Sequence, residues 1–150
     1  MSNITIVGAG MMGSALAFPA RENGHNVRLT GTHLDQEIIA ESKRTGKHPK
    51  FDKPFPAGVE YFYIEELEKA LDGADMVICG VNSFGVEWFM ERVFPHIPDA
   101  TPVLSVTKGL IAYDDGTLIS YPEYWERNIA PRKMNLNAVG GPCTSLGVIH

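Results

Sequence analysis

The sequence predicts an α/β fold in which a doubly wound, mostly parallel sheet carries helices on both faces. Three observations support this prediction. Short apolar runs alternate with helical patterns along all 150 residues, which is typical of parallel strands joined by helices. Residues 76–81 (MVICGV) are apolar throughout, as expected of a central parallel strand buried on both faces. Glycines at GxGxxG spacing follow the first apolar run and precede a helix-forming segment, which is the order of a Rossmann-type βαβ unit.

The first βαβ unit opens the chain. Residues 4–7 are rich in β-branched side chains, as in a buried strand. A helix follows with the SALA segment at residues 14–17, and Pro19, which has no amide proton, predicts a kink in it. An Asn-Gly pair at residues 23–24 is a signal for the helix end, and residues 25–30 (HNVRLT) alternate like a second strand.

The glycines between this strand and helix have separate roles. Gly8 permits the tight turn, Gly10 lets the backbone approach a pyrophosphate without an intervening Cβ, and Gly13 lets the helix pack close to the strand. The amides of Met11 and Met12 would point toward a bound phosphate, supported by the helix dipole. Because the pattern lies between a strand and a helix, it predicts a dinucleotide site, with a purely structural turn as the alternative.

A second helix is predicted where Leu34, Ile38 and Ile39 repeat at helical spacing. Asp35 falls in its first turn, where a carboxylate suits the helix dipole. A loop at residues 42–56 follows, with four lysines, one arginine and three prolines. This loop either flanks an anionic adenosine ribose or is a solvated connection.

The remaining elements continue the alternation. Helical patterns cover residues 65–75 and 84–94, and the apolar stripe of the latter is interpreted as core. Residues 114–131 resemble a capped helix that is interrupted by proline. Further strands are expected at residues 59–63, 76–81, 102–107 and 135–139.

Length and composition indicate one globular domain, because 44% of the residues are hydrophobic and suffice for a core without disulfides or metal. A net charge of −5 and the lack of a long basic run argue against nucleic acid as a partner. No apolar stretch reaches the ~18 residues that a membrane helix requires, so we expect a cytoplasmic protein. Cys79 and Cys143 are expected to be reduced thiols.

The end of the second strand bears on the choice of cofactor. Enzymes that select NAD usually offer a carboxylate about 20 residues past the glycines, but residues 30–33 read TGTH. The missing carboxylate leaves room for a 2′-phosphate, aided by Arg28, Lys43 or Arg44. We therefore expect NADP to be tolerated at least as well as NAD.

Two later segments also follow predicted strands. Lys108 precedes a glycine after the fifth strand, which puts an ammonium where a nicotinamide and a substrate carbonyl or phosphate would meet; the alternative is a surface lysine. Residues 140–144 (GGPCT) offer turn amides to an anion, with an ordinary tight turn as the alternative. The five histidines lack metal-ligand spacing, so no metal site is predicted, and no nucleophile has a neighbouring base.

Four segments, IVGAGMMGSALA, NGHNVRLTGT, VTKGL and GGP, occur in this order. Together they resemble the N-terminal domain of the NAD(P)-dependent glycerol-3-phosphate dehydrogenases, over essentially the whole chain. TKG and the GP turn are the specific parts, since many oxidoreductases share the glycine pattern. The resemblance implies reversible hydride transfer between NAD(P)H and dihydroxyacetone phosphate, giving sn-glycerol 3-phosphate for phospholipid synthesis.

The resemblance also implies roles for single residues. Thr32 would lie near the adenosine ribose, and Lys108 would reach both cofactor and substrate. The implied cofactor contacts are Gly8, Gly10, Met11, Met12, Gly13, Thr32, Lys108 and Ser145. The implied substrate contacts are Lys108, Gly141 and Cys143.

Departures from the family pattern accompany these matches. The family usually has a hydroxyl or small residue at Cys143, and an alanine at Ser145 followed by glutamate at Gly147. Family members also extend well beyond this length and place the general-base lysine and phosphate-binding residues in a helical C-terminal domain, which these 150 residues lack. We therefore expect the chain to bind the dinucleotide but not to turn over substrate unaided.

Two alternatives stay open. One is another two-domain dehydrogenase, of the ketopantoate reductase or 6-phosphogluconate dehydrogenase type, against which Lys108-Gly109 speaks. The other is a non-catalytic nucleotide-binding or self-associating module. Leu146, Val148 and Ile149 have no expected partner strand, and an exposed apolar tail would favour a homodimer.

Overall fold

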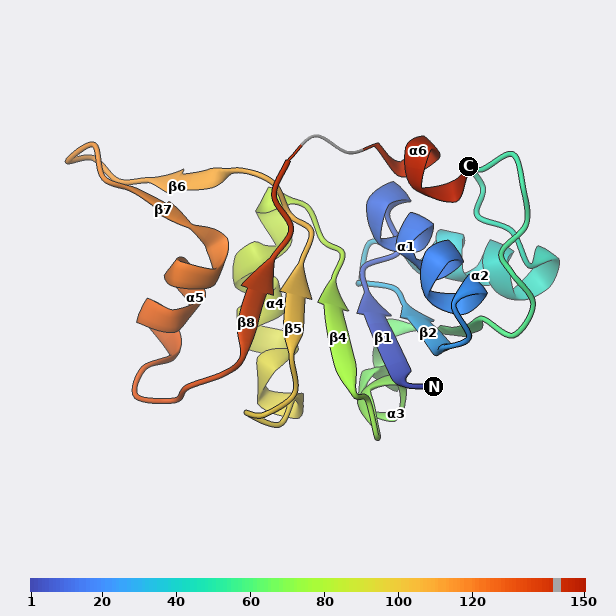
Figure 1. The fold of residues 1–150 in the computed structure, drawn as a ribbon, viewed down its shortest axis with the longest axis horizontal. Helices are drawn as coiled ribbons and strands as arrows, with labels where there is room; N and C mark the ends of the chain where they lie inside the picture. The colour runs from blue at the N-terminus through green and yellow to red at the C-terminus, as the bar shows by residue number, and fades with distance from the viewer. Residues whose placement is uncertain (142–143) are drawn as a thin grey trace.

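The computed structural model describes residues 1–141 and 144–150 of the chain (Figure 1). Six strands form one sheet in the order β3-β2-β1-β4-β5-β8, and each neighbouring pair is parallel. The strand order reverses between β1 and β4, which confirms the predicted doubly wound fold. The strands are β1 (Asn3–Val7), β2 (Asn26–Thr30), β3 (Glu60–Phe62), β4 (Met76–Cys79), β5 (Val103–Ser105) and β8 (Leu136–Ala138).

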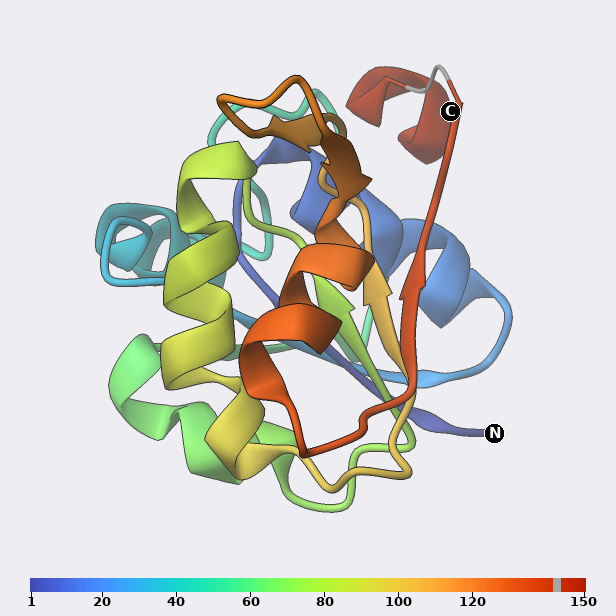
Figure 2. The ribbon, with the colours of Figure 1, turned by 90° about the vertical axis from the view of Figure 1, so that its left-hand side faces the viewer.

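Helices cover both faces of this sheet, as Figures 1 and 2 show. On one face, α1 (Met11–Glu22), α2 (Gln36–Thr45) and α6 (Ser145–Ile149) contribute buried residues to a first core. On the other face, α3 (Leu67–Leu71), α4 (Val86–Arg92) and α5 (Tyr121–Ile129) contribute to a second core. Three short 3-10 turns flank α3 and α4, namely η1 (Ile64–Glu66), η2 (Ser83–Gly85) and η3 (Phe94–His96).

The second core centres on Trp125 of α5, whose side chain is fully buried. The indole Nε1 donates a hydrogen bond to the carbonyl oxygen of Val86 at 3.0 Å. The ring stacks on Phe89 at 5.7 Å and meets Phe94 edge-on at 5.0 Å between centroids. The apolar stripe of α4 therefore packs as core, and these contacts join α4 to α5. The two helices lie on the same face of the sheet (Figure 2).

The predicted helix over residues 114–131 is wrong in its first half. A hairpin of β6 (Leu110–Ala112) and β7 (Leu118–Ser120) precedes α5. Its turn is closed by Asp115, whose Oδ1 accepts a hydrogen bond from the Thr117 amide at 2.9 Å, and the Ser120 hydroxyl then caps α5. Pro122 lies in the first turn of α5, where a missing amide proton costs no hydrogen bond, so it is compatible with the start of this helix and does not interrupt it.

The loop predicted at residues 42–56 is shorter and better packed than expected. Helix α2 continues to Thr45 and ends at Gly46, which adopts the left-handed conformation with φ of 70°. In the segment after Gly46, three rings are buried, those of His48, Phe51 and Phe55. The solvated connection is therefore wrong for this part of the loop, because its aromatic side chains belong to the first core.

The end of the described chain is also packed. Helix α6 lies against α1 (Figure 1), and Ile149 is only 3% exposed, although Leu146 is 50% exposed. The expectation of a fully exposed apolar tail is thus wrong.

Helix α1 itself continues past Pro19 to Glu22. Among the described residues, no helix has the length and apolar character needed to cross a membrane, and the cytoplasmic location stays a prediction.

Candidate functional site

A cleft of about 810 Å³ lies at the carboxyl ends of the strands, where doubly wound sheets bind ligands. Seven of the predicted site residues line it, contributed by the tips of β1, β2 and β5 and by α1 and α6: Gly8, Gly10, Met11, Met12, Thr32, Lys108 and Ser145. Gly13 packs against the backbone of Gly8 and Gly80, and Gly141 contacts Lys108. Cys143 lies outside the described residues. The fold thus gathers most of the predicted residues at one place.

The three glycines of the first turn differ in what surrounds them. A Cβ on Gly8 would lie 2.7 Å from the carbonyl carbon of Gly80, and a Cβ on Gly13 would lie 2.2 Å from the carbonyl oxygen of Gly8. A Cβ on Gly80 would in turn lie 2.8 Å from Cα of Gly13. Packing within the protein therefore requires glycine at these positions, since the opposing atoms are all backbone.

Gly10 has no such requirement. A Cβ there would meet no atom within 4 Å, and its φ of −66° is open to any residue. Gly10 lines the cleft, so the room that its missing side chain leaves is room inside the cleft. A dinucleotide diphosphate requires room of this kind, because the phosphate must approach the backbone closely.

The N-terminus of α1 faces the same room. Met11 and Met12 lie in the first turn of this 12-residue helix, whose backbone N–H groups have no acceptor within the helix. The first turn carries no acidic side chain. Free amides and the positive end of the helix dipole therefore favour an anion at this point of the cleft.

Asp35 lies at this turn as well, contrary to the simple dipole role expected from its place before α2. Its Oδ2 accepts hydrogen bonds from the backbone N–H of Ala9 at 3.0 Å and of Thr32 at 2.8 Å. Asp35 also lines the cleft. Residues 30–33 contain no carboxylate, as the sequence shows. The expectation that no carboxylate lies near the end of β2 is nevertheless wrong, because Asp35 folds back to Thr32.

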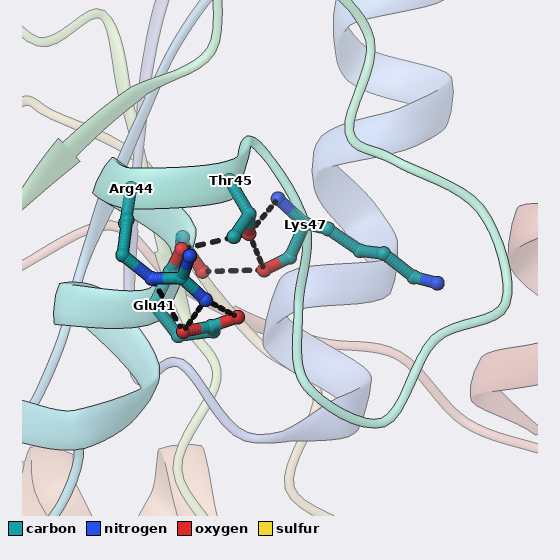
Figure 3. A network of polar contacts seen from close by, with 5 residues as sticks. Glu41, Arg44, Thr45 and Lys47 are labelled. Atoms are coloured by element: carbon teal, nitrogen blue, oxygen red, sulfur yellow. Dashed lines mark hydrogen bonds and ion pairs between the residues drawn. The ribbon is translucent and has the colours of Figure 1, made fainter.

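The three cations considered for a 2′-phosphate have other partners, and none lines the cleft. Arg28 donates hydrogen bonds to the carbonyl oxygens of Ala70 and Asp72. Lys43 pairs with a glutamate, Glu66, at 3.4 Å. Arg44 pairs with Glu41 at 2.7 Å, within the polar network at the end of α2 that Figure 3 shows.

Lys108 lies on the opposite side of the cleft, just after β5. Its Nζ donates a hydrogen bond to the carbonyl oxygen of Gly141 at 2.7 Å. The preceding residue, Thr107, is anchored by a hydrogen bond from its hydroxyl to the carbonyl oxygen of Val81 at 2.6 Å. The tips of β4 and β5 are therefore joined at the point where the Lys108 side chain leaves the sheet.

Two cleft residues, Phe84 and Trp88, are not singled out by the sequence. Phe84 lies in the short turn η2, beyond the end of β4, and is 94% exposed at the cleft, whereas the pattern of residues 84–94 predicts a helix residue there. His33 and Trp88 also line the cleft, and their rings lie 5.7 Å apart between centroids. The signal for Phe84 was present, because a residue just beyond a central strand lies at the ligand edge of such a sheet.

Cys79 ends β4 but takes no part in the cleft. Burial raises the pKa of its thiol to about 12, against weaker opposing hydrogen bonds from Val81, Thr107 and Ser105. A thiol with so high a pKa is protonated at neutral pH and is a poor nucleophile. Cys79 is therefore a free, structural residue, as the sequence predicted.

Comparison with known proteins identifies the family. A model described as the NAD-dependent glycerol-3-phosphate dehydrogenase N-terminus matches residues 3–149. The chain belongs to this family. The match confirms the resemblance seen in the sequence and decides against the ketopantoate reductase and 6-phosphogluconate dehydrogenase types. NAD(P) is the cofactor class of the family, as its relatives' names state.

Among the relatives of this glycerol-3-phosphate dehydrogenase domain are an NADP(+)-dependent glycerol-3-phosphate dehydrogenase from Archaeoglobus fulgidus, 38% identical over 93% of the chain, and a glycerol-3-phosphate dehydrogenase [NAD(P)+] from Koribacter versatilis, 34% identical over 95%. The chain spans 41% of the length of each. A crystal structure of glycerol-3-phosphate dehydrogenase from Coxiella burnetii shares the fold, with a TM-score of 0.78 at 24% identity, covering 99% of this chain and 43% of that one.

Proposed function

We propose that this chain binds a nicotinamide dinucleotide in the cleft, with the diphosphate on the N-terminus of α1. The observation that carries the proposal is the open space beside Gly10. No packing contact within the protein requires glycine at this position, because a Cβ there would meet no atom within 4 Å. Met11 and Met12 would hold the diphosphate through their backbone N–H groups. Thr32 would lie near the adenosine ribose and Ser145 near the rest of the cofactor, since both line the cleft.

We further propose that the bound substrate is a small phosphorylated ketone or alcohol, dihydroxyacetone phosphate or sn-glycerol 3-phosphate. When bound, the cofactor supplies or accepts the hydride. Lys108 would hold the substrate by its charge, and its bond to Gly141 fixes the Nζ at the cleft. Gly141 and Cys143 are the other proposed substrate contacts.

Turnover requires a proton donor as well as bound cofactor. We propose that this group, a lysine, and the substrate-phosphate ligands belong to the part of the relatives that these residues do not span. The chain alone should therefore bind NADPH without appreciable reduction of dihydroxyacetone phosphate.

Calorimetric titration with NADPH, followed by an absorbance assay with dihydroxyacetone phosphate, tests both parts. Saturable binding without turnover is expected. Absence of binding would overturn the cofactor proposal, and turnover at an ordinary enzymatic rate would overturn the need for a further domain. NADPH binding much weaker than NADH binding would contradict the expected tolerance of NADP, which the NADP(+)-dependent relative supports.

A second proposal concerns self-association. Large apolar side chains are exposed around the cleft and on the β6–β7 hairpin, namely Phe84, Leu110, Leu118 and Leu146. Exposed apolar side chains of this size favour association of two copies of the chain. Light scattering across a concentration series should show a dimer, and a monomer at all concentrations would contradict this proposal.

A further inference from the structure

His48 is a buried imidazole in the segment between α2 and β3, outside the residues that line the cleft. Its Nδ1 accepts a hydrogen bond from the backbone N–H of Lys50 at 3.1 Å. Its Nε2 lies 3.1 Å from the carbonyl oxygen of Ala9. Because Nδ1 is an acceptor here, the neutral ring carries its proton on Nε2 and donates it to Ala9.

The Ala9 carbonyl belongs to the peptide group whose N–H is that of Gly10. In a trans peptide these two bonds point in opposite directions. A donor that holds the Ala9 carbonyl toward the protein therefore aims the Gly10 N–H away from that donor. The Ser14 hydroxyl donates to the same carbonyl at 3.1 Å, so two side chains share this task.

The preceding peptide group is fixed from another direction. The backbone N–H of Ala9 donates to Asp35 Oδ2 at 3.0 Å. Ala9 lies between two glycines, which have the greatest backbone freedom of all residues. Without side-chain partners, the turn would sample several orientations before a ligand arrived. The three partners hold it in one orientation and so reduce the entropy that binding must overcome.

His48 is itself held by aromatic packing on α1. Its ring stacks on Phe51 at 4.5 Å between centroids, with an interplanar angle of 28°. Phe51 meets Phe18 of α1 edge-on at 5.9 Å, and Phe55 lies 5.4 Å from Phe18. The segment is thus bound to the same helix whose N-terminus faces the cleft.

We propose that His48 is a positioning residue of the dinucleotide site: its Nε2–H holds the Ala9–Gly10 peptide so that the phosphate turn is ready to bind. This inference rests on the proposed binding of a nicotinamide dinucleotide. It assigns the segment after α2 a role in cofactor affinity although no residue of that segment lines the cleft.

A matched pair of variants tests the hydrogen bond. H48Q keeps a side-chain N–H donor, whereas H48M has a similar length and no donor. H48F adds a variant that keeps a stacking ring without a donor. We expect the NADPH dissociation constant to rise about tenfold in H48M and H48F, equivalent to ~1.4 kcal/mol, and H48Q to recover most of this affinity.

F55L is the control, because Phe55 packs on Phe18 and does not line the cleft. It should lower the melting temperature and leave the dissociation constant within about twofold. Amide proton exchange supplies a readout without ligand: the Gly10 N–H should exchange differently in H48M than in wild type and F55L. This change separates turn orientation from general loss of stability.

The outcomes distinguish the two proposals. If the wild-type chain binds NADPH and H48M binds it equally well, the His48 inference is overturned while the proposed function stands. If affinity falls in F55L as much as in H48M, the role of His48 is only structural and the inference is again overturned. If the wild-type chain does not bind NADPH, the proposed function fails and the inference fails with it.

Discussion

Replacing Gly10 with alanine separates the role of this glycine from those of Gly8 and Gly13. The new methyl group would meet no atom within 4 Å, and the backbone conformation, φ −66° and ψ 178°, is one that alanine adopts readily. We therefore expect G10A to fold normally. It should nevertheless bind NADPH poorly, because the methyl group would occupy the space proposed for the diphosphate.

The expected change in stability is small because two terms oppose each other. Alanine restricts the unfolded chain, which stabilises the fold by about 0.4–1 kcal/mol. Alanine is also a poorer N-cap residue than glycine, which costs roughly 0.5–1 kcal/mol. The net change should stay within ~1 kcal/mol, or about 2–4 °C in Tm. Loss of one hydrogen bond to a charged phosphate costs about 1.5–3 kcal/mol, which raises the dissociation constant at least about tenfold.

G13A is the matched control within the same motif. Its Cβ would lie 2.2 Å from a backbone oxygen that cannot rotate away, so it should lose stability at or beyond the upper end of the ~1–3 kcal/mol typical of overpacking. Thermal unfolding and NADPH titration of both variants provide the measurement. A G10A variant that binds NADPH like wild type, or that unfolds as readily as G13A, would refute the reasoning.

Three further predictions concern buried side chains. Burial lowers the pKa of His48, and Lys50 adds to this, while the bond to Ala9 and the charge of Asp35 oppose it. As the pH falls below about 6.5, the imidazole of His48 therefore binds a proton in the unfolded chain before it does so in the folded chain. The free energy of unfolding should then fall by up to ~1.4 kcal/mol per pH unit. Urea unfolding measured across this pH range should show that H48Q lacks this contribution. In the same assay, the free energy of unfolding of W125A should be lower by about 3–5 kcal/mol, and the variant should keep its NADPH affinity, because Trp125 fills the second core and does not line the cleft. Cys79 should resist iodoacetamide in the native chain and react only on unfolding, as mass spectrometry of its peptide can establish; rapid native labelling would contradict its raised pKa.

The parts of the fold that could be predicted have local signals. Glycine spacing predicts the first turn, and an unbroken apolar run predicts the central strand β4. The hairpin before α5 could not be separated from the helix, because the decisive feature is where α5 begins. Ser120 sets that start by capping the helix, which turns Pro122 from an interruption into a first-turn residue.

The site was predictable where a residue follows a strand and unpredictable where it arrives through tertiary packing. Lys108 illustrates the first case, since it comes directly after β5. Asp35 and His48 illustrate the second, because they contact Ala9 from 26 and 39 positions along the chain. The basic sequence around His48 gives no signal that this side chain is buried. Its burial results from the packing of Phe51 and Phe55 on α1.

The mutual contact of Gly8, Gly13 and Gly80 constrains how this corner of the molecule can evolve. Each residue occupies the room that a methyl group on another would need, and none can be made smaller to relieve an exchange elsewhere. In ordinary cores, a larger side chain at one position can be offset by a smaller one at a neighbouring position. This compensation is not available to Gly8, Gly13 and Gly80. At this point the closest approach of the α1 terminus to β1 and β4 is limited by main-chain atoms, whatever side chains fill the two cores.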